Sequence, residues 1–336
     1  MAEPCYGRPM RLIVQLLSLL VRGTALMLGL VGLGFAGACL GGAWSDRLDA
    51  FTHAAPLWLM MGVGAVVLGG IFARGGERWV MLGLGVATLL ACSVLMLPEL
   101  WASWRFKPAT PAASDLKIVQ FNIWHDNKTP EKSLAWVMAQ DADVVIVEEG
   151  AGDAWPAIQA LKTAYPFASC DKVSKCETWI FSRKKMIARG GMPTDRPYLS
   201  GAWATLADAK GPFTVVGVHY TWPVPAGIQQ NQSRKLVRFA SDFDKKSTII
   251  TGDFNSTPWS FTLKRQDKAL GLRRWTRAIP SWPASKFSRV MVAPAPFLPI
   301  DHVYAGGEWY AVNVERGPAL GSDHRPILIT LRRGPK

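Results

Sequence analysis

Polar and acidic side chains recur along residues 115–330, mostly just after short apolar stretches. In chain order they are Asn122, Glu148, Glu149, His219, Asp253, Asn255, Asp301, Asp323 and His324. Active sites of open α/β sheets lie where strands end, and oxygen ligands from several strand ends suit Mg²⁺ or Mn²⁺. Two histidines beside carboxylates can stabilise charge on a phosphoryl group, one of them oriented by an acid. The set therefore predicts divalent-metal chemistry on phosphate.

Short apolar strands alternate with helical stretches in the same part of the chain. We expect strands at Lys117–Phe121, Val144–Val147, Thr178–Phe181, Ala202–Leu206, Thr214–Val218, Thr248–Thr251 and Ile327–Leu331. We expect helices at Glu131–Ala139, Ala154–Thr163, Ile228–Asp244 and Ser260–Gln266. Strands mixed with helices, several of them joined by hairpin-length gaps, favour an α/β layered fold with a mixed sheet.

A series of ordered motifs spans essentially all of residues 115–333. The motifs are IVQFNIW (118–124), DADVVIVEEG (141–150), WIFSRK (179–184), VVGVHYTWP (215–223), ITGDFNSTPWS (250–260), PIDHVYAG (299–306) and GSDHRPI (321–327). Together they resemble the motif set of the endonuclease/exonuclease/phosphatase superfamily, and most closely its bacterial membrane-anchored members. The resemblance implies a four-layer α/β/β/α sandwich, in which helices flank two mixed sheets.

The resemblance also implies a metal site. By match to the family motifs, Asn122 contacts metal or phosphate, and Glu149 and Asp323 are acidic ligands of Mg²⁺ or Mn²⁺. Most relatives carry Gln where this chain has Glu148, so a second acid stands beside the expected ligand. Such an acid could draw in another cation or raise a neighbour's pKa. We expect Glu149 to be the ligand, from its register with the apolar run.

Five further residues match the family's catalytic positions. His219 would donate to the scissile phosphate, and Asp253 would position or deprotonate the attacking water. Asn255 would hold Asp253 and a phosphate oxygen. Asp301 would orient His324, which would stabilise the pentavalent transition state.

The implied activity is metal-dependent hydrolysis of a phosphodiester or phosphomonoester by activated water. Nucleic acid and a phospholipid headgroup or other small phosphoester both remain open as substrates, and the membrane segments described below mildly favour the lipid. The contrasting hypothesis is a catalytically inactive membrane protein that keeps the fold as a binding module.

Several other residues are expected to have structural roles, or more than one role remains open for them. His125 is read as a surface loop residue, and His302 as a packing residue or a phosphate neighbour. Trp222 and Trp259 could stack on a base or an acyl chain, or pack in the core or rim. Arg183 is read as a strand-capping residue without a catalytic role. A basic patch could comprise Lys172, Lys175, Lys184, Lys185 and the stretch Lys264–Arg277.

The first third of the chain is unusually poor in charge. Residues 1–106 carry 7 Lys and Arg and 5 Asp and Glu, whereas residues 107–336 carry 31 and 20. Uncharged runs at Gly23–Ala43, Pro56–Ala73 and Trp79–Leu97 have the length that crosses a bilayer. Leu12–Val21 could add a lead-in helix. We therefore expect an anchor at 1–106, a Pro/Ala/Ser linker at 107–114 and a catalytic domain at 115–336.

Loop charges and cysteines indicate the side of the membrane. With the N-terminus inside, five Lys and Arg residues of the loops lie inside and three outside, which places the domain outside the cytoplasm. Cys170 and Cys176 could close a disulfide in an oxidising compartment or remain free thiols. We expect an inner (cell) membrane protein with a periplasmic or extracytoplasmic domain, and the oligomeric state stays open.

Overall fold

The chain was analysed as a computed structural model, which describes residues 7–170, 176–284 and 292–334. It divides into two compact units, Met1–Pro98 and Glu99–Lys336. Each unit is described by itself below.

The first unit is helical. It contains α1 (Gly7–Gly41), α2 (Asp46–Asp49), the 3-10 helix η1 (Ala50–Ala54), α3 (Ala55–Phe72) and most of α4 (Gly75–Trp104). Three helical stretches are long and apolar enough to cross a membrane: Met10–Gly41, Asp46–Phe72 and Gly75–Trp104. The expected lead-in helix is continuous with the first apolar run, so α1 begins well before Gly23.

Arg22 lies inside α1 rather than at its end, and its charge is balanced by an ion pair. Its Nη1 lies 2.7 Å from Glu77 Oε1 near the start of α4. Glycine allows α3 and α4 to approach closely, because a Cβ on Gly85 would lie 2.9 Å from the carbonyl oxygen of Gly62. Large apolar side chains such as Met60 and Leu90 are exposed on the outside of these helices, as expected for surfaces that meet lipid tails rather than water.

The second unit contains two six-stranded sheets. The first has the order β11-β12-β1-β2-β4-β3 and the second β5-β6-β7-β8-β10-β9. The strands of the first sheet are β1 (Leu116–Asn122), β2 (Val144–Glu148), β3 (Phe167–Ala168), β4 (Trp179–Ser182), β11 (Trp309–Arg316) and β12 (Ile327–Arg333). Those of the second are β5 (Met186–Gly191), β6 (Ser200–Asp208), β7 (Gly211–His219), β8 (Ile249–Asp253), β9 (Arg273–Arg274) and β10 (Asp301–Ala305). Both sheets are mixed: β1–β2 and β7–β8 are parallel, and the other pairs are antiparallel.

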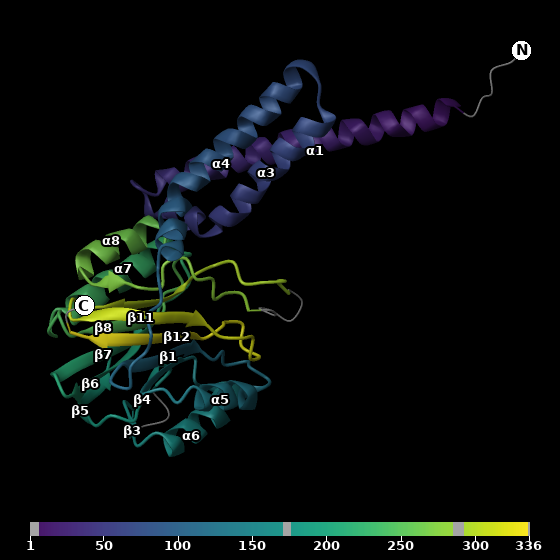
Figure 1. The fold of residues 1–336 in the computed structure, drawn as a ribbon. Coiled ribbons are helices and arrows are strands. Elements are labelled where there is room, and N and C mark those ends of the chain that lie inside the picture. The colour runs from purple at the N-terminus through teal and green to yellow at the C-terminus, as the bar shows by residue number, and fades with distance from the viewer. Residues whose placement is uncertain (1–6, 171–175, 285–291, 335–336) are drawn as a thin grey trace, which may run out of the picture. The chain divides into compact units, whose positions relative to one another are not determined.

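The two sheets face each other across one apolar core. Successive side chains of a strand point to opposite faces, so Ile118, Ile146 and Ile329 of the first sheet meet Val215, Val303 and others of the second. The outer face of the first sheet packs under α5 (Pro130–Ala139) and α6 (Trp155–Ala164), which follows the short helix η2 (Gly152–Ala154). The outer face of the second packs under α7 (Ala226–Ala240) and α8 (Phe261–Leu270). Figure 1 shows these helix pairs on opposite sides of the strands. The four-layer α/β/β/α fold is confirmed.

The residues between α4 and β1 are held against the domain rather than hanging free. The amide of Ala109 donates to the carbonyl of Val312 over 2.8 Å. Arg332 donates to the carbonyl of Thr110 and, through Nε over 2.6 Å, to the carboxylate of Asp115. Asp115 Oδ2 also accepts from the amide of Ala112. The expected linker is therefore an ordered part of the domain surface.

Some elements differ from the sequence expectations. Strands β5, β10 and β11 were not expected, and α7 ends at Ala240 rather than Asp244. The α7 pattern continues to Phe243, but Ser241 Oγ donates back to the carbonyl of Arg238 over 2.6 Å. Asp244 then accepts from the amide of Lys246 and forms a turn. Local hydrogen bonds of Ser and Asp thus end the helix before the apolar pattern does.

Candidate active site

The site lies where the inward-facing positions of the two sheets continue past the apolar core. On β1 the residues after Ile118 on this face are Gln120 and Asn122, because side chains alternate along a strand. On β7 and β8 the same face ends in His219 and Asp253, which are Cα partners in the ladder. Asp253 is also the Cα partner of Asp301 on β10. The strand pairing alone therefore gathers His219, Asp253 and Asp301 on adjacent strands.

Close backbone approach requires glycine beside Asp253. A Cβ on Gly252, whose φ is +149°, would lie only 1.9 Å from the carbonyl oxygen of Val218. The glycine of the GDFN motif thus lets β8 fit against β7. Asn255 follows with a φ of +45°, and its amide nitrogen donates to Asp253 Oδ1 over 2.8 Å. Its side-chain Nδ2 donates to the carbonyl of Tyr220 over 2.9 Å, which ties the turn to the end of β7.

Glu148 and Glu149 point in different directions. Glu148 is the last residue of β2 and is fully buried; its Oε2 accepts from Gln120 Nε2 over 3.1 Å. Glu149 has a φ of +55°, a conformation unfavourable for a residue with a side chain. Its carboxylate reaches Asn122 Nδ2 at 3.0 Å and lies near His219 Nε2 at 3.6 Å. The backbone turn therefore separates a buried acid from a partly exposed one.

The surroundings of Glu148 and Glu149 also shift the pKa values of the two acids in opposite directions. Burial, together with the neighbouring Asp301 and Asp253, raises the pKa of Glu148 well above its usual value. Burial alone would also raise the pKa of Glu149, but His219 and the hydrogen bonds from Asn122 and His125 lower it to about 2. Glu149 is thus ionised at neutral pH and available to a cation, whereas the surroundings of Glu148 favour its neutral form.

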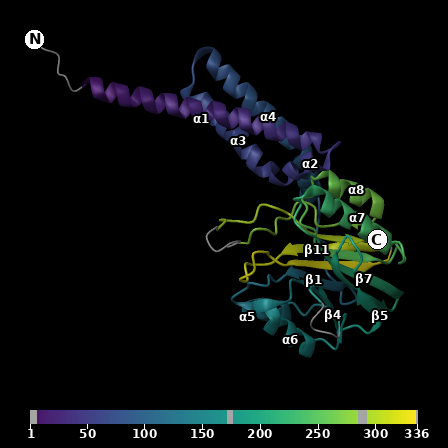
Figure 2. The same ribbon diagram turned by 180° about the vertical axis from the view of Figure 1, so that it is seen from behind.

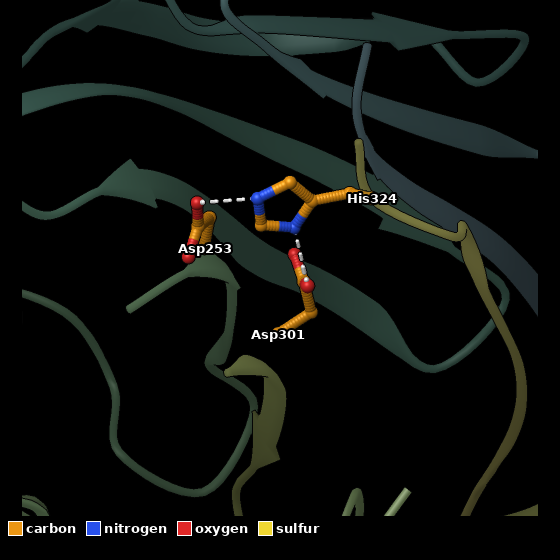
Figure 3. Close-up of side chains that lie close together, drawn as sticks. All are labelled: Asp253, Asp301 and His324. Carbon is orange, nitrogen blue, oxygen red and sulfur yellow. Dashed lines mark hydrogen bonds and ion pairs between the residues drawn. The ribbon is translucent and has the colours of Figure 1, made fainter. Parts of the chain in front are cut away.

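His324 lies between two carboxylates, as Figure 3 shows. Its Nδ1 lies 2.8 Å from Asp301 Oδ2 and its Nε2 lies 3.4 Å from Asp253 Oδ2. Gln120 Nε2 donates to the other oxygen of Asp301 over 2.8 Å. His324 itself comes from the turn before β12, where its amide donates to Ser322 Oγ and that hydroxyl donates to the carbonyl of Asn122. The catalytic turn is therefore fastened to the end of β1.

The pKa values of Asp253, Asp301 and His324 depend on one another because the three side chains of this trio are in contact. Burial lowers the pKa of His324, but Asp301 and Asp253 raise it more, and the outcome lies well above the usual value. Burial raises the pKa of Asp253 to about 6, against the lowering effect of His324. For Asp301 the proximity and hydrogen bond of His324 outweigh burial and lower the pKa. The two carboxylates therefore favour the protonated form of His324, and the pKa of about 6 allows Asp253 to exchange a proton near neutral pH.

The ligand atoms of Asp253, Asp301 and His324 lie within 4.8 Å of one another, which is close enough for a metal ion by distance alone. Both ring nitrogens of His324 already face carboxylates. A metal ligand needs a neutral imidazole with a free nitrogen lone pair. Both ring nitrogens of His324 are therefore engaged, which disfavours it as a metal ligand in this arrangement.

A second donor set fits a hard cation better. The carboxylates of Glu149 and Asp323 provide the oxygen ligands that Mg²⁺ and Mn²⁺ prefer, and Asn122 contacts Glu149 through its Nδ2. Asp323 Oδ1 is buried and has no hydrogen-bond partner among the residues that the structure describes. Its Oδ2 accepts from Trp282 Nε1 over 3.1 Å. A buried carboxylate oxygen without a partner is costly, and a bound cation would satisfy it.

His125 was expected to be a surface loop residue rather than a catalytic one, and its contact with Glu149 was not expected. It is half exposed on a loop, as expected, but its Nδ1 lies 2.7 Å from Glu149 Oε2. The hydrogen bond to Glu149 raises the pKa of His125. Its position three residues after Asn122 was a usable signal, because a loop leaving β1 must pass the end of the parallel neighbour β2.

Three other residues have the positions of structural groups. His302 is fully buried, with Nε2 2.8 Å from the carbonyl oxygen of Ser256, as a packing role requires. Trp259 is buried in the core. Arg183 forms an ion pair with Asp141 outside the site. Trp222, by contrast, is 60% exposed and packs edge-on against Trp282, the residue that holds Asp323.

The expected basic patch is only partly available. Lys172 and Lys175 lie outside the described residues. Lys184 pairs with Asp143 at 3.2 Å. Within the second unit, Arg274 is fully buried against Asp267 and Glu99, and Arg277 shares Glu99. Part of the positive charge in the stretch Lys264–Arg277 is therefore neutralised inside the domain.

Comparison with known proteins identifies the class. Residues 119–324 match the family model described as the Endonuclease/Exonuclease/phosphatase family. That match covers more than half of the chain, so the chain belongs to this family, whose members are metal-dependent phosphoesterases. No protein with a curated description matches the chain.

Solved structures with TM-scores of 0.50 and above show the same fold at low sequence identity. The human Nocturnin catalytic domain, solved with a bound sulfate anion, has a TM-score of 0.51 and 12% identity; the match covers 67% of this chain and 96% of that one. An endonuclease/exonuclease/phosphatase from Bacteroides vulgatus has a TM-score of 0.50 and 17% identity; the match covers 65% of this chain and 99% of that one. Beta toxin from Staphylococcus aureus, solved with bound magnesium ions, has a TM-score of 0.47 and 15% identity; the match covers 66% of this chain and 100% of that one.

Proposed function

We propose that this family member hydrolyses a phosphodiester or phosphomonoester bond with an activated water and a divalent cation. The observation that carries the proposal is His324 fixed between Asp301 and Asp253, directly beside the ionised Glu149. The trio supplies proton transfer, and the neighbouring oxygens supply cation binding. A binding module without catalysis would not need a buried imidazolium between two acids.

Asp253 takes the proton of the attacking water. Its pKa of about 6 suits a general base at neutral pH. Asn122 Nδ2 and the amide of Asn255 donate to its two oxygens over 3.0 and 2.8 Å and fix the orientation of the carboxylate. The water is thereby aimed from one direction, as an in-line displacement requires.

His219 and His324 stabilise the charge that develops on the phosphoryl oxygens. Asp301 holds His324 in its protonated form through the 2.8 Å contact with Nδ1. His219 Nε2 lies 3.6 Å from Glu149 and 3.7 Å from Asp253, so it borders both the cation-binding and the proton-transfer groups. Fixed donors of this kind lower the barrier because they need no reorganisation during the reaction.

Glu149, Asn122 and Asp323 are the residues we assign to Mg²⁺ or Mn²⁺. When bound, the cation would polarise a phosphoryl oxygen and offset its developing charge. Glu148 is not assigned to the cation, because it is fully buried behind Gln120 and its pKa is raised well above the usual value.

The substrate class within phosphoesters remains nucleic acid or a phospholipid headgroup or other small phosphoester. We favour the second, since the three long apolar helices would keep the site close to lipid. The exposed Trp222 on the rim, packed against Trp282, is consistent with either kind of substrate.

We further propose that residues 1–106 anchor the chain in the cell membrane, that 107–114 connect, and that the catalytic domain from 115 to 336 faces the periplasm or the exterior. The disulfide between Cys170 and Cys176 supports an oxidising compartment. The weak excess of positive charge on the N-terminal side supports the same orientation.

A substrate panel tests the proposal. The full-length chain in detergent would be assayed on bis-p-nitrophenyl phosphate, plasmid DNA, RNA, sphingomyelin and inositol phosphates, with Mg²⁺ or Mn²⁺ and with EDTA. We expect hydrolysis of at least one substrate that EDTA abolishes. Background rates on every substrate with either cation would contradict the proposal.

A further inference from the structure

A groove runs between α7 and α8, away from the catalytic residues. The two helices lie side by side on the outer face of the second sheet, as Figures 1 and 2 both show. Two pockets of about 420 and 300 Å³ lie along them. Val237 and Ala269 line both pockets, so the two form one continuous groove. None of its lining residues belongs to the proposed active site.

One half of the groove is rimmed by positive charge. Arg234 and Arg238 of α7 lie four residues apart and therefore on one helix face, and Arg265 of α8 lines the same pocket. The other lining residues of this pocket are uncharged, namely Gln230, Ser233, Val237, Thr262, Gln266 and Ala269. The guanidinium groups of Arg234 and Arg238 border a pocket with no acid in its lining, which creates a local preference for an anion.

The positive charge of α7 is not neutralised by close carboxylates. Arg234 donates to the neutral side chains of Asn231 and Gln230 over 2.9 Å each. Among the residues that the structure describes, neither Arg234 nor Arg238 forms an ion pair. This distinguishes the groove from the stretch around Arg274, where Asp267 and Glu99 neutralise the charge inside the domain.

The other half of the groove is largely apolar. Ala240, Phe243, Leu270 and Leu272 line it beyond Val237 and Ala269, and Lys245 is its only charged lining residue. Phe243 is only partly buried, and Ala269 is exposed on the surface of α8. The groove therefore offers a cationic end and an adjoining apolar channel, which is the complement of an anionic amphiphile.

We infer that the α7–α8 groove binds an anionic phospholipid, with the phosphate at Arg234 and Arg238 and part of an acyl chain along Val237, Phe243 and Leu272. Guanidinium groups suit phosphate because they form paired, charge-assisted hydrogen bonds. The chain itself argues for lipid as the source of this chemistry. It carries three helices fit to cross a bilayer, and only 11 residues separate Trp104 from Leu116, a span of at most about 40 Å.

This inference does not depend on the proposed catalysis, since the lipid is bound as a ligand and need not be hydrolysed. Native mass spectrometry of the full-length chain in detergent would test it, with added dioleoyl phosphatidylglycerol or dioleoyl phosphatidylcholine. Arg234→Gln/Arg238→Gln removes two charges from the groove. Lys132→Gln/Lys268→Gln is the matched control, because it removes two exposed charges that line neither pocket. Ala269→Glu places a negative charge in the middle of the groove.

We expect the wild type and the control to retain phosphatidylglycerol at least about 10-fold more tightly than the arginine variant and Ala269→Glu. Phosphatidylcholine binding should be equal in all four chains. A photoactivatable phosphatidylglycerol should label peptides of α7 or α8 in the wild type. Thermal unfolding within a few degrees of wild type would show that the variants fold.

Three results would overturn the inference. One is equal phosphatidylglycerol retention in all four folded chains. Another is labelling confined to residues 7–104. The third is a DNA duplex that binds with the same dependence on Arg234 and Arg238 while phosphatidylglycerol fails to displace it, which would make the groove a nucleic-acid site.

Discussion

At the scale of single residues, the proposed mechanism assigns proton transfer and cation binding to different side chains. Asp301 contacts His324 and Gln120 and lies on the buried side of the trio. Glu149 lies on the more open side, where it contacts Asn122, His125 and His219. Substitutions of Asp301 and Glu149 should therefore impair different properties, namely the catalytic rate and the affinity for the cation.

We predict that Asp301→Asn lowers kcat by about 10²–10⁴-fold with little change in the Mn²⁺ concentration for half-maximal rate, because His324 loses its ionised partner. Glu149→Gln should instead raise that Mn²⁺ concentration at least about 10-fold, since a ligand is lost. Mn²⁺ titrations of the hydrolysis rate would measure both quantities. The opposite pattern, with Asp301→Asn weakening the cation, would assign the trio to the metal.

His302 provides a pH-dependent contribution to stability. Burial, with a smaller effect from Arg274, lowers its pKa to about 4 from 6.5. The folded state thus binds fewer protons than the unfolded state between these values, so stability is full above pH 6.5 and is lost as pH falls toward 4. A shift of this size corresponds to roughly 3 kcal/mol.

We predict that His302→Gln, which does not titrate, loses less stability than the wild type between pH 7 and pH 4. Thermal unfolding by tryptophan fluorescence, measured for both chains across this range, would show it. The variant should be less stable at pH 7 and should approach or exceed the wild type at pH 4. Parallel curves would show that His302 is not held neutral by the fold.

Much of this site could be predicted residue by residue, since each motif places a polar residue at or just beyond the end of a strand and the fold brings those ends together. The distinction between Glu148 and Glu149 rests on register and on a positive φ at Glu149, and only the register is readable from a single sequence. The role of His125 depends on where a loop passes a neighbouring strand, which local pattern does not specify.

At the scale of elements, α8 is bounded by two local signals. Ser260 Oγ accepts from the amide of Leu263 over 3.1 Å at the N-terminus, and Gly271 adopts the left-handed conformation at the C-terminus. Ser caps satisfy an amide that would otherwise lack a partner. This explains why the expected start at Ser260 was one residue from the observed helix.

We predict that Ser260→Ala lowers the free energy of unfolding by about 1 kcal/mol, or roughly 2–4 °C in apparent Tm for a domain of this size. Ser260→Thr keeps the hydroxyl and should recover most of the loss. Thermal unfolding of the three chains would measure it. An unchanged Tm in Ser260→Ala would show that the cap contributes nothing.

Two of the strands that sequence reasoning missed, β5 and β10, have weak local patterns. β5 (MIARGG) contains two glycines and an arginine, and β10 begins with Asp-His before its apolar residues. Both become strands because neighbouring strands offer hydrogen bonds, as β8 does for β10 along Asp253–Ile249. Tertiary pairing of this kind overrides local propensity. β2 and β8 are buried on both faces and were found because they begin with runs of β-branched apolar residues.

At the scale of the whole molecule, the apolar helices and the disulfide make a joint prediction about topology. A reporter fused after residue 110 should be active only outside the cytoplasm. In the exported chain, mass spectrometry of fragments cleaved between Cys170 and Cys176 should find them linked until a reductant is added. A reporter active only in the cytoplasm, together with free thiols at both positions, would place the domain on the other side.

We propose above all that the domain catalyses phosphoester hydrolysis through Asp253. The most direct measurement is the rate of bis-p-nitrophenyl phosphate hydrolysis by the full-length chain with saturating Mn²⁺, compared with Asp253→Ala. We predict an EDTA-sensitive rate for the wild type that falls by at least about 10²-fold in the variant. Equal background rates in both chains, on this and on the other phosphoesters of the panel, would contradict the account and favour a binding module.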